Sequence, residues 1–277
     1  MAFTFELILR SNFLTYFKEW GFMRLISICP SNTELLAYLG LTDKIIAVDD
    51  FSDWPKEIQN LPRLGSDLNI DMDKVEQLKP DLVIASLSVP GMERNIEQLE
   101  KRNIPHIVLN PNSLEDIYQD MLLVGKKMNI EEEANRVASK FLADIEALKQ
   151  ANQEKKRGRI YWEWWPKPIF TPGQTNWLTN ISEIVGGENC FSDYKKASVQ
   201  TTWEEVVQKN PDHICMVWVG VQENKMKLEA ITKREKANEI NAVQKNNLYI
   251  LEESLFCRPS PRVIEGIKKL SKTLREL

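Results

Sequence analysis

Aromatic side chains, rather than catalytic groups, are the residues of this sequence best suited to chemistry. The stretch YWEWWPKPIFTPGQTNWL, residues 161–178, holds Trp162, Trp164, Trp165 and Trp177, half of the eight tryptophans in the chain. Large rings of this kind bind flat, partly apolar molecules. The prolines of the stretch fix φ and oppose regular structure, so the sequence predicts a stiff, ring-lined loop. Because rings lose few rotamers on binding, such a wall is ordered before a ligand arrives.

Enzymatic activity has little support in the sequence. The only two histidines, His106 and His213, lie far apart, and the four cysteines form no C-x-x-C pair. The chain contains none of the phosphate-binding, nucleophile-elbow or zinc-protease motifs. Adjacent acids such as Asp49 and Asp50 are more typical of a solvated surface than of an acid–base couple. We therefore predict a protein that is not an enzyme and has neither a catalytic cofactor nor a metal site.

Composition and charge are those of an ordinary globular protein. Hydrophobic residues make up 43% of the 277 residues and charged residues 27%, enough for one large domain or two modest ones. The net charge is −4, and no basic stripe is present. Nucleic acid is not an expected partner, because phosphate binding needs clustered Lys and Arg.

Strand-like and helix-like segments alternate from residue 23 onward, which predicts parallel α/β architecture. The strand-like runs are 25–29, 45–48, 82–85 and 107–109, and the helix-like segments are 32–39, 72–78, 94–101 and 114–127. Ser31 and Glu34 have the spacing of a capping box at the start of the first helix. The first half of the chain therefore predicts one α/β lobe.

A long amphipathic segment, residues 130–156, precedes a second α/β half. Its apolar residues recur every three or four positions, which predicts one helix of roughly 40 Å. The second half has strand-like runs at 160–164, 214–218 and 248–251, and helix-like segments at 177–185, 203–209 and 261–277. We predict an N-terminal extension (1–22), an N-terminal α/β lobe (23–129), a connecting backbone helix (130–156) and a C-terminal α/β lobe (157–277).

One short sequence recurs in the two halves. VEQLKPDLV at 75–83 and VVQKNPDHI at 206–214 both pass from a predicted helix through Pro-Asp into a predicted strand. Their first valines are Val75 and Val206, and we call the separation between these two positions the repeat offset. Such junctions also recur by chance in α/β proteins, so the match alone leaves both explanations open. Together with the alternation, it favours two similar lobes joined by a helical spine.

Several aromatic residues follow predicted strands, at the edge where α/β sheets bind ligands. Rings on the amphipathic helices, Trp177 and Trp203, are more simply core residues. The others lie in loops rich in Pro, Ser and Asp, where a buried ring has few neighbours, so we predict that they line a cleft between the lobes. They are Phe51, Trp54, Trp164, Trp165 and Phe256, and Arg258 lies beside the last of them.

Four segments resemble the cobalamin-binding proteins of vitamin B12 ABC importers: PSNTELLAYLG (30–40), LKPDLVIAS (78–86), FTPGQTNWLTNISEIVGGENCFSD (170–193) and FCRPSPRVIEGI (256–267). Those proteins belong to the helical-backbone family, or class III, of substrate-binding proteins, which also carries iron–siderophore complexes. The resemblance implies two Rossmann-like lobes with parallel sheets, joined by one rigid helix. It implies that cobalamin is the bound ligand and that the partners are the permease and ATPase of a vitamin B12-type importer. We expect a monomer.

The resemblance also assigns ligand contacts by position. The cleft-lining aromatics of the family fall on Phe51 and Trp164, and a ligand-contacting arginine falls on Arg258. A strand-end position that carries tryptophan in some members is Ser86 here. The predicted ligand contacts are therefore Phe51, Trp54, Ser86, Trp164, Trp165, Phe256 and Arg258.

Permease docking in that family uses one acidic residue in each lobe, which meets arginines of the transporter. By position these acids fall on Asp73 and Glu204, which are separated by the repeat offset. Each lies two residues before the repeated valine. The alternative is that both are ordinary solvated helix carboxylates.

The cellular location follows from two signals that conflict. Residues 1–22 carry charges within their apolar run, and neither a signal-peptide cleavage site nor a lipoprotein cysteine follows, which predicts the cytoplasm. The resemblance implies an extracytoplasmic, membrane-associated protein. Two alternatives to a corrinoid importer component therefore stay open: an iron–siderophore binder of the same fold, and a cytoplasmic corrinoid-handling factor or enzyme.

Overall fold

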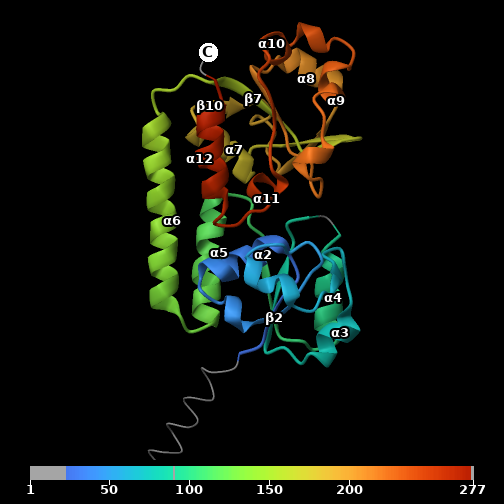
Figure 1. Cartoon of the computed structure of the whole chain (residues 1–277), viewed down its shortest axis with the longest axis vertical. Coiled ribbons are helices and arrows are strands. Elements are labelled where there is room, and N and C mark those ends of the chain that lie inside the picture. Colours follow the sequence, from blue (N-terminus) through green and yellow to red (C-terminus); the bar gives the residue numbers. More distant parts are fainter. Residues whose placement is uncertain (1–22, 90, 276–277) are drawn as a thin grey trace, which may run out of the picture. The chain divides into compact units, whose positions relative to one another are not determined.

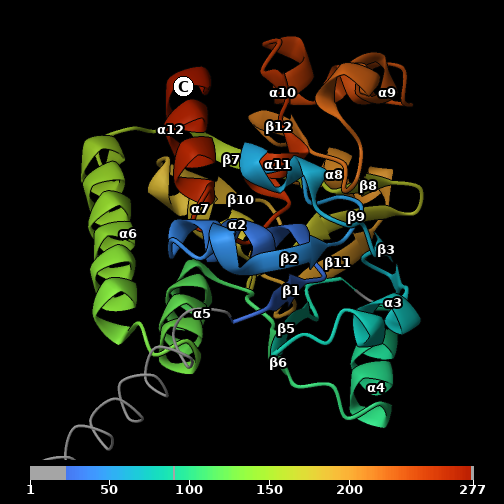
Figure 2. The same ribbon diagram turned by 60° about the horizontal axis from the view of Figure 1, so that its bottom comes forward.

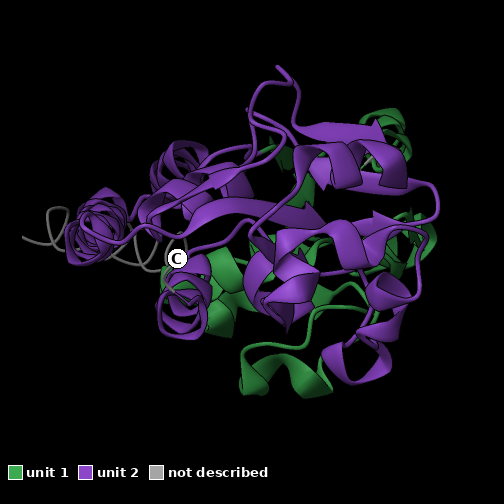
Figure 3. Ribbon diagram, turned by 90° about the horizontal axis from the view of Figure 1, so that it is seen from above, with its two compact units in different colours: residues 1–110 green, residues 111–277 purple. Residues whose placement is uncertain are grey.

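A computed structural model of the chain describes residues 23–89 and 91–275. The predicted N-terminal extension, 1–22, lies outside the described residues. By their contacts the residues form two compact units, Met1–Asn110 and Pro111–Leu277, which Figure 3 distinguishes by colour. Each unit contains its own parallel sheet.

The first unit is built on a four-stranded parallel sheet in the order β2-β1-β5-β6. Its strands are β1 (Leu25–Ser27), β2 (Ile45–Val48), β5 (Leu82–Ser86) and β6 (His106–Leu109). They are short apolar runs, mostly buried, as expected of a parallel sheet covered by helices. The helices are α2 (Pro30–Tyr38), α3 (Met72–Gln77) and α4 (Glu93–Lys101), with 3₁₀ turns η1 (Thr42–Lys44) and η2 (Lys56–Asn60). A hairpin, β3 (Gly65–Ser66) and β4 (Asn69–Ile70), precedes α3, and Figure 2 shows α3 beside α4.

The second unit contains another four-stranded parallel sheet, in the order β10-β7-β12-β13. Its strands are β7 (Gly158–Glu163), β10 (Gly187–Asn189), β12 (His213–Met216) and β13 (Leu248–Ile250). The longer helices are α5 (Leu114–Lys127), α6 (Glu131–Asn152), α7 (Trp177–Ile184), α8 (Trp203–Lys209) and α12 (Val263–Thr273). Shorter helices are η3 (Glu223–Lys225), α9 (Glu229–Thr232), η4 (Ala237–Glu239), α10 (Asn241–Gln244) and α11 (Glu253–Phe256).

The first helix begins earlier than the sequence predicted. Pro30 is the first residue of α2 and Cys29 is its N-cap, so Ser31 lies inside the helix and the predicted Ser31–Glu34 capping box is wrong. Proline suits the first turn because its φ is already helical and its missing N–H would have no partner there. A complete capping box instead starts α5, where Ser113 and Asp116 hydrogen-bond each other's backbone N–H groups.

The predicted backbone helix corresponds to α6, which ends at Asn152, earlier than the predicted end at residue 156. At 22 residues it is roughly 33 Å long. It runs alongside α5 and α12 and also contacts α7 (Figure 1). Gly125 of α5 permits this approach, because a Cβ there would collide with the Cβ of Ala134. The four-part division of the chain, with this helix as the connector, stays a prediction.

The same hydrogen-bonded junction recurs in the two sheets. In the first unit the N–H of Arg24 donates to the Asp81 carboxylate (2.7 Å), and the N–H of Asp81 donates to the Arg24 carbonyl (2.9 Å). The Arg24 guanidinium then donates to the carbonyl of Leu78 (2.8 Å). The second unit makes the same three bonds with Arg159, Asp212 and Lys209.

The helix that precedes each junction ends in the same way. Lys79 (φ 45°) and Asn210 (φ 43°) both adopt the left-handed conformation that stops the helix, and the repeat offset separates them too. Equivalent strands also occupy equivalent places in the two sheet orders. The recurring sequence is therefore a structural repeat rather than a chance match.

Between the predicted strand at 160–164 and the predicted helix at 177–185, residues 165–176 are not the irregular loop that the prolines predicted. After β7, the segments β8 (Trp165–Pro166) and β9 (Ile169–Pro172) form a hairpin, and β11 (Ser198–Thr201) pairs with β9. The result is a three-stranded antiparallel sheet in the order β11-β9-β8. The prolines fit because β8 is an edge strand and Pro172 ends β9, where a backbone N–H is dispensable. The prediction of no regular structure here was wrong.

Asp120 of α5 is a carboxylate in an unfavourable electrostatic environment. Its Oδ2 atom is buried and accepts no hydrogen bond. Burial, and secondarily repulsion by Asp116, raises the pKa of Asp120 from 3.8 to about 7. Because the folded chain then holds this proton more tightly than the unfolded chain, the Asp120 contribution lowers stability as the pH rises from about 4 to about 7.

The substitution Asp120→Asn should therefore stabilise the protein only where Asp120 is ionised. We expect the free energy of unfolding to rise by on the order of 1–3 kcal/mol at about pH 8, and by almost nothing near pH 4. Urea unfolding of both proteins at the two pH values measures this difference. An equal effect at both would show that Asp120 is not the titrating group.

Candidate functional site

The predicted aromatic contacts of the first unit follow β2. Phe51 is 50% exposed, and Trp54 is half-buried with its ring 5.8 Å from that of Tyr38. The buried carboxylate of Asp49 accepts the N–H groups of Phe51 (2.8 Å) and Ser52 (3.0 Å) and the Ser52 hydroxyl (2.5 Å). Burial raises the pKa of Asp49 to about 6, and these hydrogen bonds act against that rise. The turn that presents Phe51 is thus fixed from within.

Ser86 ends β5 and is buried. Its hydroxyl donates to the hydroxyl of Ser88 (2.9 Å) and accepts the N–H of Ser88 (3.1 Å). Sequence reasoning missed Leu68, which is 43% exposed in the turn between β3 and β4. A large apolar residue in a tight turn between Asp67 and Asn69 was the available signal.

The aromatic contacts of the second unit follow β7 directly. Trp165 is 41% exposed, and its indole N–H donates to the carbonyl of Lys167 (3.0 Å). Trp164 is half-buried, with its ring 5.3 Å from that of Trp177. Val219, 36% exposed and not predicted, lies beside them because its N–H donates to the Trp164 carbonyl (3.1 Å). This edge therefore presents one exposed ring, one half-buried ring and an aliphatic neighbour.

Phe256 and Arg258 occupy more enclosed positions than the other predicted contacts. Phe256 is fully buried and packs on Trp162, with ring centres 5.8 Å apart. Its carbonyl accepts the indole N–H of Trp177 (2.7 Å). Arg258 is also buried and pairs with Glu253 at 3.0 Å. Phe256 is thus linked through Trp177 to Trp164, and direct contact of Phe256 or Arg258 with a ligand stays a prediction.

Glu163, the last residue of β7, is a charged group that sequence reasoning missed. It is fully buried and forms a two-pronged ion pair with Arg234, at 2.5 and 2.9 Å. The hydroxyl of Tyr161 and the indole N–H of Trp218 donate to the same carboxylate, each at 3.1 Å. Arg234 lies 71 residues further along the chain, so no local pattern could have joined the pair.

The two predicted docking acids lie at the same position of their helices. Asp73 is the second residue of α3 and is largely exposed, with its carboxylate 2.6 Å from Arg102. Glu204 is the second residue of α8 and is exposed. Hydrogen bonds from its own backbone N–H and from the Thr202 hydroxyl lower the pKa of Glu204. A helix N-terminus favours negative charge, so both positions suit an exposed carboxylate.

Each predicted docking acid also borders a hollow within its own unit. Asp73 lines one of about 230 Å³ together with Arg94 and Arg102. Glu204 lines one of about 450 Å³ together with Trp203 and Glu235. Neither hollow contains a predicted ligand contact, so both belong to the surfaces around the helices rather than to the aromatic edges.

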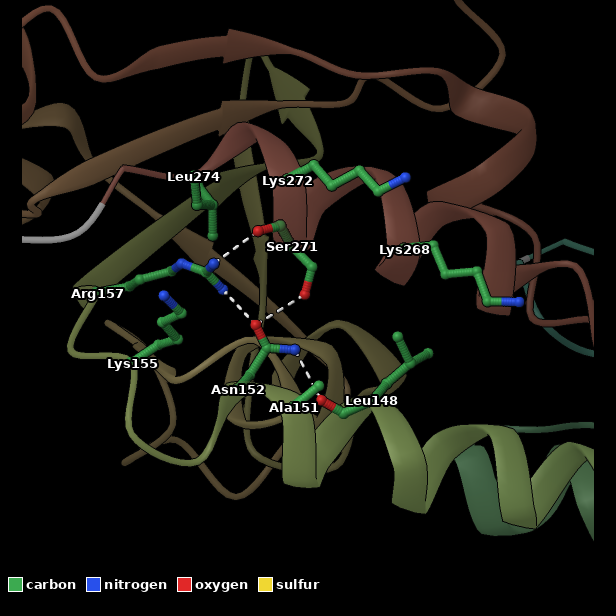
Figure 4. A pocket seen from close by; sticks show the side chains of 9 residues that line it. All are labelled: Leu148, Ala151, Asn152, Lys155, Arg157, Lys268, Ser271, Lys272 and Leu274. Carbon is green, nitrogen blue, oxygen red and sulfur yellow. Dashed lines mark hydrogen bonds between the residues drawn. The ribbon is translucent and has the colours of Figure 1, made fainter.

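A third hollow, of about 380 Å³, lies where the end of α6 approaches α12 (Figure 4). The buried Arg157 donates to the Asn152 side chain (3.0 Å) and the Ser271 carbonyl (2.6 Å), which ties the two helices together. Lys155 follows α6 and Lys272 lies in the last turn of α12, where positive charge complements the helix dipole. Because the lining contains none of the predicted contacts, we assign this hollow no ligand.

Metal-binding clusters and membrane spans are absent from residues 23–89 and 91–275. No group of three or more His, Cys, Asp or Glu side chains there could hold a metal ion. In the same residues no helix is long and apolar enough to cross a membrane.

The family described as "Periplasmic binding protein" matches residues 25–255. This chain belongs to the periplasmic binding protein family. An uncharacterized ABC transporter substrate-binding lipoprotein of Bacillus subtilis, YvrC, is 30% identical over 91% of this chain and 79% of its own length. The vitamin B12-binding protein of Vibrio parahaemolyticus is 28% identical over 88% of this chain and 86% of its own length.

Solved structures of other proteins share the fold. The vitamin B12-binding protein BtuF of Vibrio cholerae has a TM-score of 0.75 at 26% identity, covering 91% of this chain and 96% of that one. IsdE of S. aureus, solved in complex with heme, has a TM-score of 0.80 at 19% identity, covering 92% and 100%. The predicted class III α/β fold is confirmed. Periplasmic binding proteins are non-enzymatic components of transport, so the prediction that this chain is not an enzyme is confirmed as well.

Proposed function

We propose that this periplasmic binding protein binds a corrinoid, with cobalamin as the ligand to test. The observation that carries the proposal is an exposed ring at the carboxyl end of a strand in each sheet, Phe51 after β2 and Trp165 after β7. Ligands of α/β sheets bind at that edge, and a large macrocycle with apolar faces suits such rings. Relatives and a solved structure named for vitamin B12 binding support the same ligand class.

The same proposal includes delivery to an ABC importer. Asp73 and Glu204, each at the start of a short helix, would meet basic residues of the permease, whose ATPase drives transport. The relatives are described as periplasmic proteins or as a lipoprotein, which supports an extracytoplasmic, membrane-associated location. We therefore propose this location in preference to the cytoplasmic one that residues 1–22 predicted.

Heme and a ferric siderophore are the competing ligands. Neither histidine is placed to give heme an axial imidazole, because His213 is buried in β12 with its ring packed on Tyr249, and His106 bonds to the Ile104 carbonyl. A polyanionic chelate would need accessible arginines, whereas Arg258 pairs with Glu253. Both observations favour a corrinoid.

Cyanocobalamin is expected to quench the tryptophan fluorescence of the protein saturably, with a Kd in the micromolar range or below. Titration calorimetry should give the same Kd, and parallel titrations with heme and a ferric hydroxamate should be weaker. Saturable binding of the siderophore alone would replace the corrinoid by the iron chelate. Binding of neither would remove both ligands from consideration.

A further inference from the structure

The ion pair between Glu163 and Arg234 sits one residue from the aromatic edge. Glu163 ends β7, and Trp164 and Trp165 follow it directly. A carboxylate with no exposed surface is stable only when paired and hydrogen-bonded, and Glu163 accepts from Arg234, Tyr161 and Trp218. The carboxyl end of β7 is therefore fixed by side chains from several parts of the second unit.

The fold itself does not require a charge at this position. In the first sheet Leu25 pairs with Leu82, and in the second sheet Ile160 pairs with His213. Leu82 and His213 are separated by the repeat offset, so they are equivalent, and their partners Leu25 and Ile160 are equivalent too. Glu163 therefore corresponds to Ile28, which is buried among the apolar residues of the first unit. A buried ion pair often stabilises a protein no more than well-packed apolar residues would. The presence of the Glu163–Arg234 pair in only one unit therefore points to a role in fixing the local geometry at the end of β7.

Arg234 also contacts the start of α8. Its guanidinium lies 4.7 Å from the ring centre of Trp203, the first residue of α8. The indole N–H of Trp203 in turn donates to the carbonyl of Glu235 (2.7 Å), which fixes the ring. The next residue of α8 is Glu204, the docking acid. The Arg234 side chain thus contacts both Glu163, which precedes Trp164, and Trp203, which precedes Glu204.

We propose that Arg234 is a positioning residue that holds the aromatic turn after β7 and the start of α8 in one fixed geometry. The proposal rests on the proposed function, because it assigns one support to the ligand-contacting rings and to the docking carboxylate. A flat guanidinium can pair with a carboxylate through two bonds while stacking on an indole, which the point charge of lysine cannot do. Arg234→Lys should therefore fail to replace it.

The test is the affinity for cyanocobalamin at about pH 8, compared between Arg234→Met and the double variant Glu163→Gln/Arg234→Met. Without its partner, the buried Glu163 carboxylate should displace the aromatic turn, so the single variant should bind about 10-fold more weakly at about pH 8. The double variant, which has no buried charge but also lacks the Arg234 bridge, should bind more tightly than the single variant and still about threefold more weakly than the wild type.

Of the side chains that hydrogen-bond to Glu163 in the described residues, the charged or titratable ones are Tyr161 of its own strand and Arg234. Burial raises the pKa of Tyr161 well above its ordinary value, so Tyr161 stays neutral at about pH 8. Arg136→Met is the matched control, because Arg136 makes a similar two-pronged pair with Glu133 on the exposed face of α6. It should leave affinity unchanged.

Hydrogen exchange supplies a readout that needs no ligand. The N–H of Trp164 donates to the Phe170 carbonyl and that of Val219 to the Trp164 carbonyl, so both should exchange at least about 10-fold faster in Arg234→Met. Unchanged exchange in Arg234→Met, or a double variant that binds as tightly as the wild type, would refute the positioning role. If the wild type itself does not bind cyanocobalamin, the corrinoid proposal fails, and the exchange rates still decide the role of Arg234.

Discussion

Replacing Trp164 by alanine is expected to weaken cyanocobalamin binding by about 1–3 kcal/mol, roughly 5- to 150-fold in Kd. The change removes a ring at the carboxyl end of β7 and also the contact of Trp164 with Trp177, so the wall loses both area and order. Titration calorimetry of the purified variant measures the loss. Thermal unfolding in the absence of ligand shows whether the variant is folded.

Leu123→Ala provides the control for this substitution. Leu123 is also a large apolar side chain with substantial exposure, but it lies on α5 and not at a strand end. Its removal should leave affinity unchanged. If Trp164→Ala bound cyanocobalamin as tightly as the wild type, the ring would be a packing residue and the aromatic edge of the second unit would lie elsewhere.

Charge reversal at both docking acids, Asp73→Lys with Glu204→Lys, is expected to abolish stimulation of the cognate importer's ATPase in reconstituted membranes. Exposed carboxylates facing arginines set the orientation and rate of association, and lysine at these positions would repel the partner. Ligand affinity should stay nearly unchanged, because neither residue lies at an aromatic edge. Stimulation by the wild type should weaken as the salt concentration is raised.

The matched control reverses two other exposed carboxylates, with Glu132→Lys and Glu146→Lys on α6. The change in net charge is the same, so any loss confined to the first pair must come from position. If the variant with Asp73→Lys and Glu204→Lys still stimulated the importer's ATPase normally, these acids would be ordinary surface residues with no role in docking. If the wild-type protein did not stimulate the ATPase of any importer, the proposal that an ABC importer is its partner would be wrong.

Local patterns in the sequence determined most of the regular elements. The alternation of apolar runs and amphipathic segments predicted α/β class, and three elements, β2, α5 and α8, have the predicted bounds. These signals survive in a single sequence because burial of one helix face, or of a short strand, leaves a periodic trace. The Pro-Asp repeat likewise marked two equivalent junctions, since the same local hydrogen bonds require the same residues.

Contacts between distant residues were decided only by the tertiary structure. The pairing of β8 and β9 with β11 made strands of a proline-rich stretch, because a ladder can pass the prolines at an edge or an end. The different exposure of Phe256 and Trp165 was also decided by the tertiary structure. From the sequence alone, an aromatic residue is equally compatible with a buried core and with an exposed binding surface. Folding buried Phe256 against Trp162 and left Trp165 exposed. The Glu163–Arg234 pair joins residues 71 positions apart, a separation over which sequence periodicity carries no information and only packing brings charges together.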